Sequence, residues 1–199
     1  MQTGGANGHG VSMCTDGTAD QPLDARRANT SPCPPAGGGA PRSLGLRIMQ
    51  DGTWLYLGSP IRRIELVKLF ASVLRREADG SYWLITPGER GRIEVDDVPF
   101  VGVELAAQGT GPDQLLCVRT NVDEWLTLGS QHPLRLRGLA DQTSDAGPVP
   151  YVEVRAGLEA RLARPVYYEL VERGEERRHH GRRRFGVWSD GVFLPLDQA

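Results

Sequence analysis

The sequence contains no apolar run that approaches the length of a membrane span, and it has few cysteines. A transmembrane helix needs roughly 20 consecutive apolar residues, so we predict no membrane partner. The three cysteines, Cys14, Cys33 and Cys117, are odd in number and form no CxxC pair, so the sequence indicates neither a disulfide framework nor a zinc site. This cysteine usage fits a reducing compartment, and the sequence predicts a cytoplasmic protein.

The sequence also lacks an excess of charge of one sign and the common catalytic patterns. Its 23 basic and 25 acidic residues give a formal net charge of −2. A chain with this charge has no overall electrostatic attraction to nucleic acid, so we predict no nucleic-acid partner. The GxSxG, HExxH, Walker A and GxGxxG patterns are all absent. We therefore predict no catalytic residue, no metal ion and no cofactor.

Large apolar side chains are nearly absent from residues 1–42, which are rich in Gly, Ala, Thr, Asp and Pro. Such a segment cannot bury enough apolar surface to offset the conformational entropy that folding removes. We predict a disordered tail over residues 1–42.

From residue 44 onward the pattern becomes that of a folded domain. The turn at Gln50–Gly52 separates two short runs of strand-forming side chains, which indicates a hairpin. Apolar residues then recur at helical spacing over residues 62–77, which predicts an amphipathic helix. Further strands follow up to residue 100. We predict a first α+β unit over residues 43–100.

The second half of the sequence resembles the first. The segments Trp54–Ser59 and Trp125–Ser130 agree at five of six positions, WLYLGS and WLTLGS. Residues 155–174 again show helical spacing, and residues 183–196 form a predicted hairpin. We predict a duplicated hairpin-helix-hairpin unit of the α+β class, with the second copy over residues 101–199 and both tryptophans buried at equivalent positions.

Six segments after residue 44 carry a family resemblance: GSPIRRIELVKLFASVLRR, YWLITPGERGRIEVDDVPF, VRTNVDEW, HPLRL, PYVEVRAGLEARLARPVYYELVE and GVWSDGVFLPL. In this order they resemble a bacterial family of uncharacterised proteins, the domain of unknown function numbered 1285. The resemblance implies a two-domain α+β core that arose by duplication, with a C-terminal domain similar to pleckstrin-homology folds. It also implies a nucleotide-like ligand bound between the domains and a role in signal transduction.

A polar group at residues 119–123 is the first candidate for ligand binding. Arg119 can form a bidentate contact with phosphate or carboxylate, while Thr120 and Asn121 offer hydrogen bonds and Asp123 can accept one from a ribose hydroxyl or a base. The alternative is an Asx-type turn in which Arg119 forms a structural ion pair.

A second candidate lies at the start of the predicted second helix. Tyr151 supplies an aromatic surface, and Arg155 and Glu159 stand one turn apart at the helix N-terminus, where an anion can bind. The alternative is that Arg155 pairs with Glu159 and that the tyrosine belongs to the core.

Carboxylates cluster at Glu94, Asp96 and Asp97 in a predicted strand. Side chains alternate along a strand, so Glu94 and Asp96 share one face and Asp97 points the other way. These groups can bind a cation or hold basic side chains of the second unit. The alternative is an edge strand that charge keeps soluble.

These residues lead to one functional hypothesis. We expect a non-enzymatic regulatory protein that binds a small anionic, nucleotide-like ligand at the interface of its two units, where Arg119 and Arg155 face a shared pocket. One alternative is a protein-protein interaction module that docks a protein partner through strand edges or the arginines at residues 182–184. Another is a metal-dependent hydrolase that uses Glu94 or Asp97.

Overall fold

The computed structural model of the protein describes residues 42–138, 148–179 and 181–197. Apart from Arg42, the predicted tail over residues 1–42 lies outside the described residues. The described part of the chain contains three β-sheets, which we name A, B and C in chain order.

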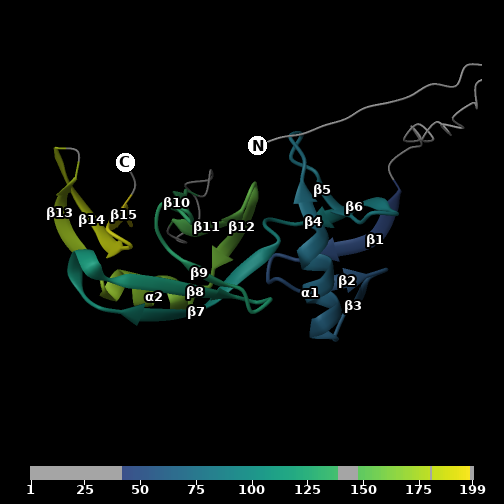
Figure 1. The fold of residues 1–199 in the computed structure, drawn as a ribbon, viewed down its shortest axis with the longest axis horizontal. Helices are drawn as coiled ribbons and strands as arrows, with labels where there is room; N and C mark the ends of the chain where they lie inside the picture. The colour runs from purple at the N-terminus through teal and green to yellow at the C-terminus, as the bar shows by residue number, and fades with distance from the viewer. Residues whose placement is uncertain (1–41, 139–147, 180, 198–199) are drawn as a thin grey trace, which may run out of the picture. The chain divides into compact units, whose positions relative to one another are not determined.

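Sheet A has six strands in the order β3-β2-β1-β6-β5-β4, and helix α1 packs against it (Figure 1). Val67 and Ala71 of α1 are buried, and the Phe70 ring stacks on Trp54 with their centroids 6.1 Å apart. The helix is therefore held by an apolar stripe. It is shorter than the predicted helix over residues 62–77, because Leu74–Arg76 form the strand β4. Its elements are β1 (Ser43–Ile48), β2 (Trp54–Tyr56), β3 (Ser59–Pro60), α1 (Ile64–Val73), β4 (Leu74–Arg76), β5 (Tyr82–Ile85) and β6 (Arg90–Val95).

Sheet B follows directly along the chain and has the order β10-β11-β12-β7-β8-β9. The strands β7 and β12 are parallel neighbours, and the other pairs are antiparallel. Its elements are β7 (Phe100–Gln108), the short 3-10 helix η1 (Gly111–Asp113), β8 (Leu115–Thr120), β9 (Trp125–Thr127), β10 (Leu134–Arg137), β11 (Val149–Arg155) and β12 (Leu158–Leu162).

Sheet C packs on sheet B through a buried polar link. The Ser189 hydroxyl donates to the Leu128 carbonyl oxygen at 2.6 Å and accepts from the Leu116 backbone N–H at 3.0 Å. A buried hydroxyl satisfied in this way fixes how the two sheets meet. The elements of this region are α2 (Arg164–Glu172), β13 (Glu175–His179), β14 (Arg182–Ser189) and β15 (Val192–Pro195).

Sheets A and B share one strand order. Each consists of two three-stranded antiparallel meanders, joined where the first strand of one meander pairs in parallel with the last strand of the other. In this correspondence β1 matches β7, β2 matches β8, and so on to β6 and β12. The helix α1 has no counterpart in sheet B, because residues 128–133 connect β9 to β10 without a helix.

The predicted α+β class, with duplicated hairpin-helix-hairpin units, is wrong. Strands in three sheets make up most of the described residues, whose two α-helices are both short. The predicted second helix over residues 155–174 is the main reason for the error. Its first part is the strand β12, entered through a turn in which Gly157 has a φ of +72°. The helix α2 begins only at Arg164, next to Pro165, because proline is tolerated in the first turn of a helix but not in its interior.

The two tryptophans of the repeated hexapeptides do not occupy equivalent positions. Trp54 lies in β2 and is 1% exposed, whereas Trp125 lies in β9 and is 49% exposed. The residues that follow also differ, since Leu57 has a positive φ in the turn to β3 but the matching Leu128 is fully buried. The expectation that both rings are buried is therefore wrong for Trp125.

None of the helices among the described residues is long and apolar enough to cross a membrane.

Candidate functional site

Arg119 is held by two carboxylates of its own sheet. From β8 it donates through Nε and Nη2 to the Glu104 carboxylate, at 2.7 and 2.6 Å, and through Nη1 to Asp123 at 2.7 Å. Hydrogen bonds to Glu104 and then to Asp123 raise the pKa of Arg119 above its ordinary value. The Arg119 guanidinium thus binds two carboxylates of the same chain. Of the two interpretations of residues 119–123, this favours the structural ion pair.

Asp123 connects this ion pair to helix α1. The Lys68 ammonium lies 2.8 Å from the second carboxylate oxygen of Asp123. Hydrogen bonds from Lys68 and then from Arg119 lower the pKa of the Asp123 carboxyl, and the same contact raises the pKa of Lys68. All three side chains are partly exposed, so the network orients these elements more than it stabilises them.

Thr120 and Asn121 complete the turn that follows β8. The buried Thr120 hydroxyl accepts the Glu124 backbone N–H at 3.1 Å, as expected for a turn-forming side chain. The Asn121 amide accepts the Val101 backbone N–H at 3.1 Å and donates to the Gly52 carbonyl oxygen at 3.2 Å. Asn121 therefore ties sheet B to the first hairpin of sheet A.

Arg155, at the end of β11, reaches across to the C-terminal turn of α1. Its Nη2 donates to the Ala71 carbonyl oxygen at 2.7 Å, and its Nη1 donates to Glu124 at 3.3 Å. The guanidinium carbon lies 5.4 Å from the centroid of the Phe100 ring. A cation at this place satisfies a terminal carbonyl and complements the helix dipole. Arg155 thus holds α1 against sheet B.

A second polar cluster joins the two sheets around Tyr151. The Tyr151 hydroxyl donates to Asp97 at 3.0 Å, and the Arg161 guanidinium lies 3.8 Å from the same carboxylate oxygen. On the other side of the cluster, Arg137 lies over the Tyr151 ring at 4.4 Å and donates to both oxygens of Glu159 at 2.6 and 2.5 Å. Tyr151, Asp97 and Glu159, three of the predicted site residues, therefore meet in one place.

Titration of Tyr151 provides a test of this cluster. Burial, and then the hydrogen bond to Asp97, raise the pKa of Tyr151 to about 12. This value lies above the pKa of an unfolded tyrosine, which is about 10. The stabilisation of the fold by the protonated Tyr151 hydroxyl is therefore fully present below pH 10 and is lost as the pH rises through about 12. We expect the phenolate absorbance transition near pH 12 to be lost in Tyr151→Phe and kept in the control Tyr56→Phe. A transition near pH 12 with unchanged amplitude in Tyr151→Phe would contradict this assignment.

The three carboxylates at residues 94–97 serve separate partners. Asp96 pairs with Arg47 of β1 at 2.7 Å, Asp97 joins the Tyr151 cluster, and the Glu94 side chain has no hydrogen bond or ion pair within the described part of the chain. Across the described ranges, no three His, Cys, Asp or Glu side chains lie close enough together to hold a metal ion.

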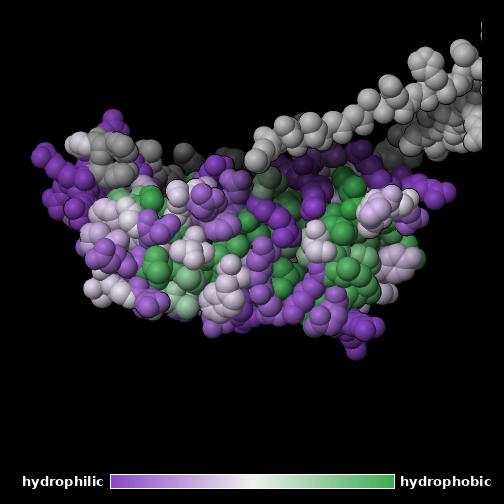
Figure 2. All heavy atoms as spheres, in the orientation of Figure 1, coloured by the Kyte–Doolittle hydropathy of each residue, from purple (hydrophilic) through white to green (hydrophobic). Residues whose placement is uncertain are grey.

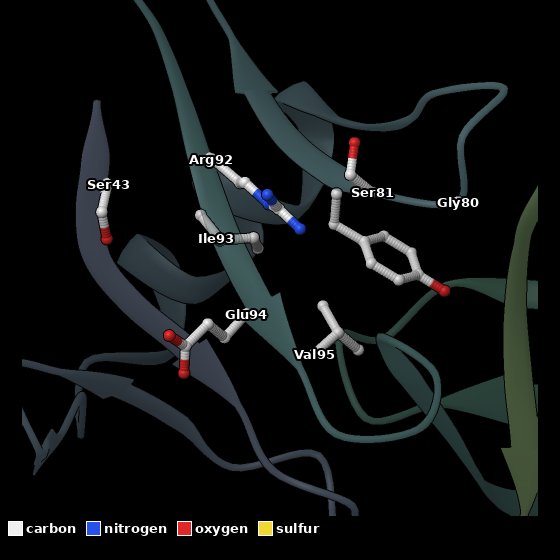
Figure 3. Close-up of a pocket in the computed structure, with 8 residues that line it drawn as sticks. Ser43, Gly80, Ser81, Arg92, Ile93, Glu94 and Val95 are labelled. Carbon is white, nitrogen blue, oxygen red and sulfur yellow. The ribbon is translucent and has the colours of Figure 1, made fainter. Parts of the chain in front are cut away.

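Glu94 instead lines a polar pocket on sheet A. The pocket has a volume of about 610 Å³, and its lining includes Ser43, Ser81, Tyr82, Arg92 and Glu94. Figure 3 shows Arg92 extending from β6 towards Ser81, while Glu94 extends towards β1. Within residues 42–138, 148–179 and 181–197, the Arg92 guanidinium makes no hydrogen bond or ion pair. Hydrogen bonds from Ser81 are the main cause that lowers the pKa of the Asp79 carboxyl, and the positive charge of Arg92 lowers it further. The pocket thus holds one unpaired cation and one unpaired anion.

The sequence profiles of known families match almost all of the described chain. The profile described as "Domain of unknown function (DUF1285), N-terminal domain" matches residues 39–98, and "Protein of unknown function (DUF1285), C-terminal domain" matches residues 99–196. A crystal structure of a DUF1285 family protein from Silicibacter pomeroyi is 42% identical, with a TM-score of 0.68 over 77% of this chain and 80% of that chain. The chain belongs to the DUF1285 family.

A second DUF1285 family protein, from Shewanella baltica, has a crystal structure that is 29% identical to this chain. Its TM-score is 0.50 over 65% of this chain and 91% of that chain. A search of curated proteins found no match. The family resemblance of the sequence segments is therefore confirmed.

The family domains give the predicted site residues a common location. Sheet A belongs to the N-terminal DUF1285 domain, and sheets B and C belong to the C-terminal domain. Most of the predicted site residues lie where these domains meet, and we call this place the domain junction. Contacts that cross it include Asn121 to Gly52, Asp123 to Lys68, Arg155 to Ala71, Tyr151 and Arg161 to Asp97, and Arg76 to the Gly157 carbonyl.

The pocket residues Arg92 and Tyr82 of this DUF1285 protein were not among the predicted site residues. A signal for Arg92 was present, because Arg92 and Glu94 alternate with Ile93 and Val95 in a predicted strand and so share one of its faces. No comparable signal existed for Arg137, since its partners Tyr151 and Glu159 belong to strands that only the sheet order brings together.

Proposed function

We propose that this DUF1285 protein is a non-enzymatic regulatory protein that binds a small anionic, nucleotide-like ligand in the polar pocket on sheet A. The observation that supports this proposal is the unpaired Arg92 guanidinium in a pocket of about 610 Å³. Small-molecule pockets typically measure about 300–1,000 Å³. This site replaces Arg119 and Arg155, whose guanidiniums already bind protein groups. The odd cysteine count is consistent with a role in the cytoplasm.

The side chains of the pocket suit the parts of such a ligand. Arg92 presents a planar set of donors that can bind a phosphate in a bidentate manner. Glu94, which is only an acceptor when ionised, can receive a hydrogen bond from a ribose hydroxyl or a base amino group. Tyr82 is half-buried and supplies an aromatic surface.

Tyr82 also connects the pocket to the domain junction. Burial is the main cause that raises the pKa of Tyr82, and charges on Arg76, Glu159, Asp97 and Arg137 act on it as well. Arg76 lies over the Tyr82 ring at 5.6 Å and donates to the Gly157 carbonyl oxygen of the C-terminal domain at 3.4 Å. A ligand that shifts Tyr82 therefore acts on a contact between the domains, which supports a regulatory role.

The test is a thermal-shift screen with AMP, GMP, CMP, UMP and inorganic phosphate, followed by calorimetric titration of the probe with the largest shift. A ligand that binds only the folded state raises the melting temperature by mass action. We expect Arg92→Gln to weaken binding of that probe by about 1.5–3 kcal/mol, the contribution of a charged hydrogen bond. The matched control is Arg62→Gln, which removes an exposed arginine of the same domain. No thermal shift with any probe, or an equal loss in both variants, would refute the proposal.

A further inference from the structure

The hairpin formed by β13 and β14 carries a concentration of positive charge that the rest of the chain does not share. Residues 175–184, which we call the cationic ribbon, contain five arginines and two glutamates, although the whole chain has a net charge of −2. The strand register places Arg177 directly opposite Arg184, and Arg178 directly opposite Arg183. Like charges directly opposite one another destabilise a strand pair. The ribbon therefore keeps an arrangement that costs stability.

Carboxylates of the protein neutralise only part of this charge. Arg177 lies 3.7 Å from Glu175, Arg183 pairs with Glu176, and Arg184 donates to Asp197 at 2.7 Å. Arg178 and Arg182 are exposed, and their guanidiniums form no hydrogen bond or ion pair with any residue that the structure describes. The unneutralised charge therefore lies towards the turn of the ribbon.

The same hairpin presents an open strand edge. In sheet C the strand order is β13-β14-β15, so β13 has a neighbour on one side only among the described strands (Figure 1). Figure 2 shows hydrophilic side chains gathered on the left of the view, where Figure 1 places β13 and β14. An edge strand leaves alternate N–H and C=O groups free to pair with another strand. Because arginines flank this edge, pairing with a second copy of β13 would place like charges together, whereas an acidic strand would neutralise them.

We propose that β13 accepts an extended acidic peptide segment of a partner protein as an additional strand of sheet C. Main-chain hydrogen bonds to the free edge provide the pairing. Successive side chains of β13 point to opposite faces, so carboxylates on one face of the added strand meet Arg178, and those on the other face lie towards Arg177 and Arg182. The partner segment therefore carries acidic residues on both faces.

An acidic peptide fits this surface better than nucleic acid does. Binding to a phosphate backbone requires a continuous cationic track, but Glu175 and Glu176 place negative charge on both faces of the ribbon where β13 begins. A peptide strand, in contrast, can use both the arginines and the unpaired main-chain groups of the edge.

The experiment measures fluorescence polarisation of a labelled peptide of about ten residues, long enough to form a strand, in which glutamates on both faces alternate with β-branched residues. A second peptide of the same sequence is N-methylated at alternate residues, which removes main-chain donors and leaves the charge unchanged. We expect the methylated peptide to bind the full chain at least about tenfold more weakly, because a strand that cannot donate cannot pair with the edge.

A protein variant tests the charge independently. We expect the double substitution Arg178→Glu and Arg182→Glu to weaken binding of the unmodified peptide by about tenfold or more. The matched control, Arg62→Glu with Arg164→Glu, makes the same charge change at exposed arginines elsewhere and is expected to bind nearly as the parent does. The proposal is overturned if the unmodified peptide does not bind, if methylation has no effect, or if both double variants lose binding equally. An oligodeoxythymidylate of equal length that binds more tightly than the peptide at the same salt concentration would also overturn it, in favour of nucleic acid.

Discussion

Replacing Trp54 with alanine is expected to lower the free energy of unfolding by about 3–5 kcal/mol, which is the cost of deleting a fully buried aromatic side chain. The ring is 1% exposed between sheet A and α1, and it stacks on Phe70 at 6.1 Å. Part of this cost comes from the cavity left behind, because the surrounding side chains relax only partially into it. Urea denaturation, monitored by circular dichroism, measures the change.

Trp125→Ala is the matched control, because Trp125 holds the same position in the second hexapeptide. Its ring is 49% exposed, so we expect a change within about 0.5 kcal/mol, as for most surface substitutions. Trp54→Phe adds a third measurement, since the buried Trp54 Nε1–H has no hydrogen-bond partner among the residues that the structure describes, and phenylalanine removes that donor. We expect Trp54→Phe to cost clearly less than Trp54→Ala. Equal losses for Trp54→Ala and Trp125→Ala would mean that the two rings share one environment after all.

The different environments of these tryptophans show that the matching hexapeptides do not occupy equivalent strands of the two sheets, since Trp54 lies in β2 and Trp125 in β9. Six adjacent residues can recur in a short strand without specifying which face is buried, since a shift of one residue exchanges the two faces of a strand. The burial order is indeed reversed, with Trp54 buried in β2 but Leu126 buried in β9. The true correspondence between sheets A and B lies in their strand order, which depends on pairings far apart in the sequence.

The two helices differ in how far the sequence predicts them, for a physical reason. α1 packs one stripe against a sheet, so its apolar residues recur with the helical period. β12 is a central strand in which Leu158, Glu159 and Ala160 are all buried, and a strand buried on both faces does not show the alternation that identifies a strand. Its leucines then continue into the spacing of α2, and the sequence suggests one long helix.

The candidate site residues were selected for what their side chains can do, which the residue types themselves show. Most of them are engaged in hydrogen bonds and ion pairs, as their chemistry requires. Their partners could not be predicted, because Arg155 binds a carbonyl oxygen 84 positions away and Asn121 one 69 positions away. A guanidinium that binds a phosphate and one that binds a helix terminus have the same appearance in a sequence. A binding role for Arg119 and Arg155 stays a prediction that mutation can test.

Arg155→Gln is expected to lower the free energy of unfolding by about 1.5–3 kcal/mol, the range for hydrogen bonds to charged groups. The substitution removes the donor to the Ala71 carbonyl oxygen and the ion pair with Glu124, and it withdraws the cation from the Phe100 ring. Loss of these contacts leaves the C-terminal turn of α1 without its partner from β11. Urea denaturation of the full chain measures the effect.

Three further variants separate the possible roles of Arg155. Arg155→Lys is expected to recover only part of the stability, because an ammonium cannot reach Ala71 and Glu124 with separate, fixed donors. Arg164→Gln, which changes an exposed arginine of the same domain, should leave the free energy of unfolding nearly unchanged. A double-mutant cycle with Glu124→Gln should give a coupling energy of about 0.5 kcal/mol or more, since the two side chains are in direct contact.

Binding of the nucleoside monophosphate probe should be unchanged in Arg155→Gln at temperatures where the variant is folded. If Arg155→Gln instead unfolds like the parent but no longer binds the probe, Arg155 belongs to the ligand site and the domain junction is where the ligand binds.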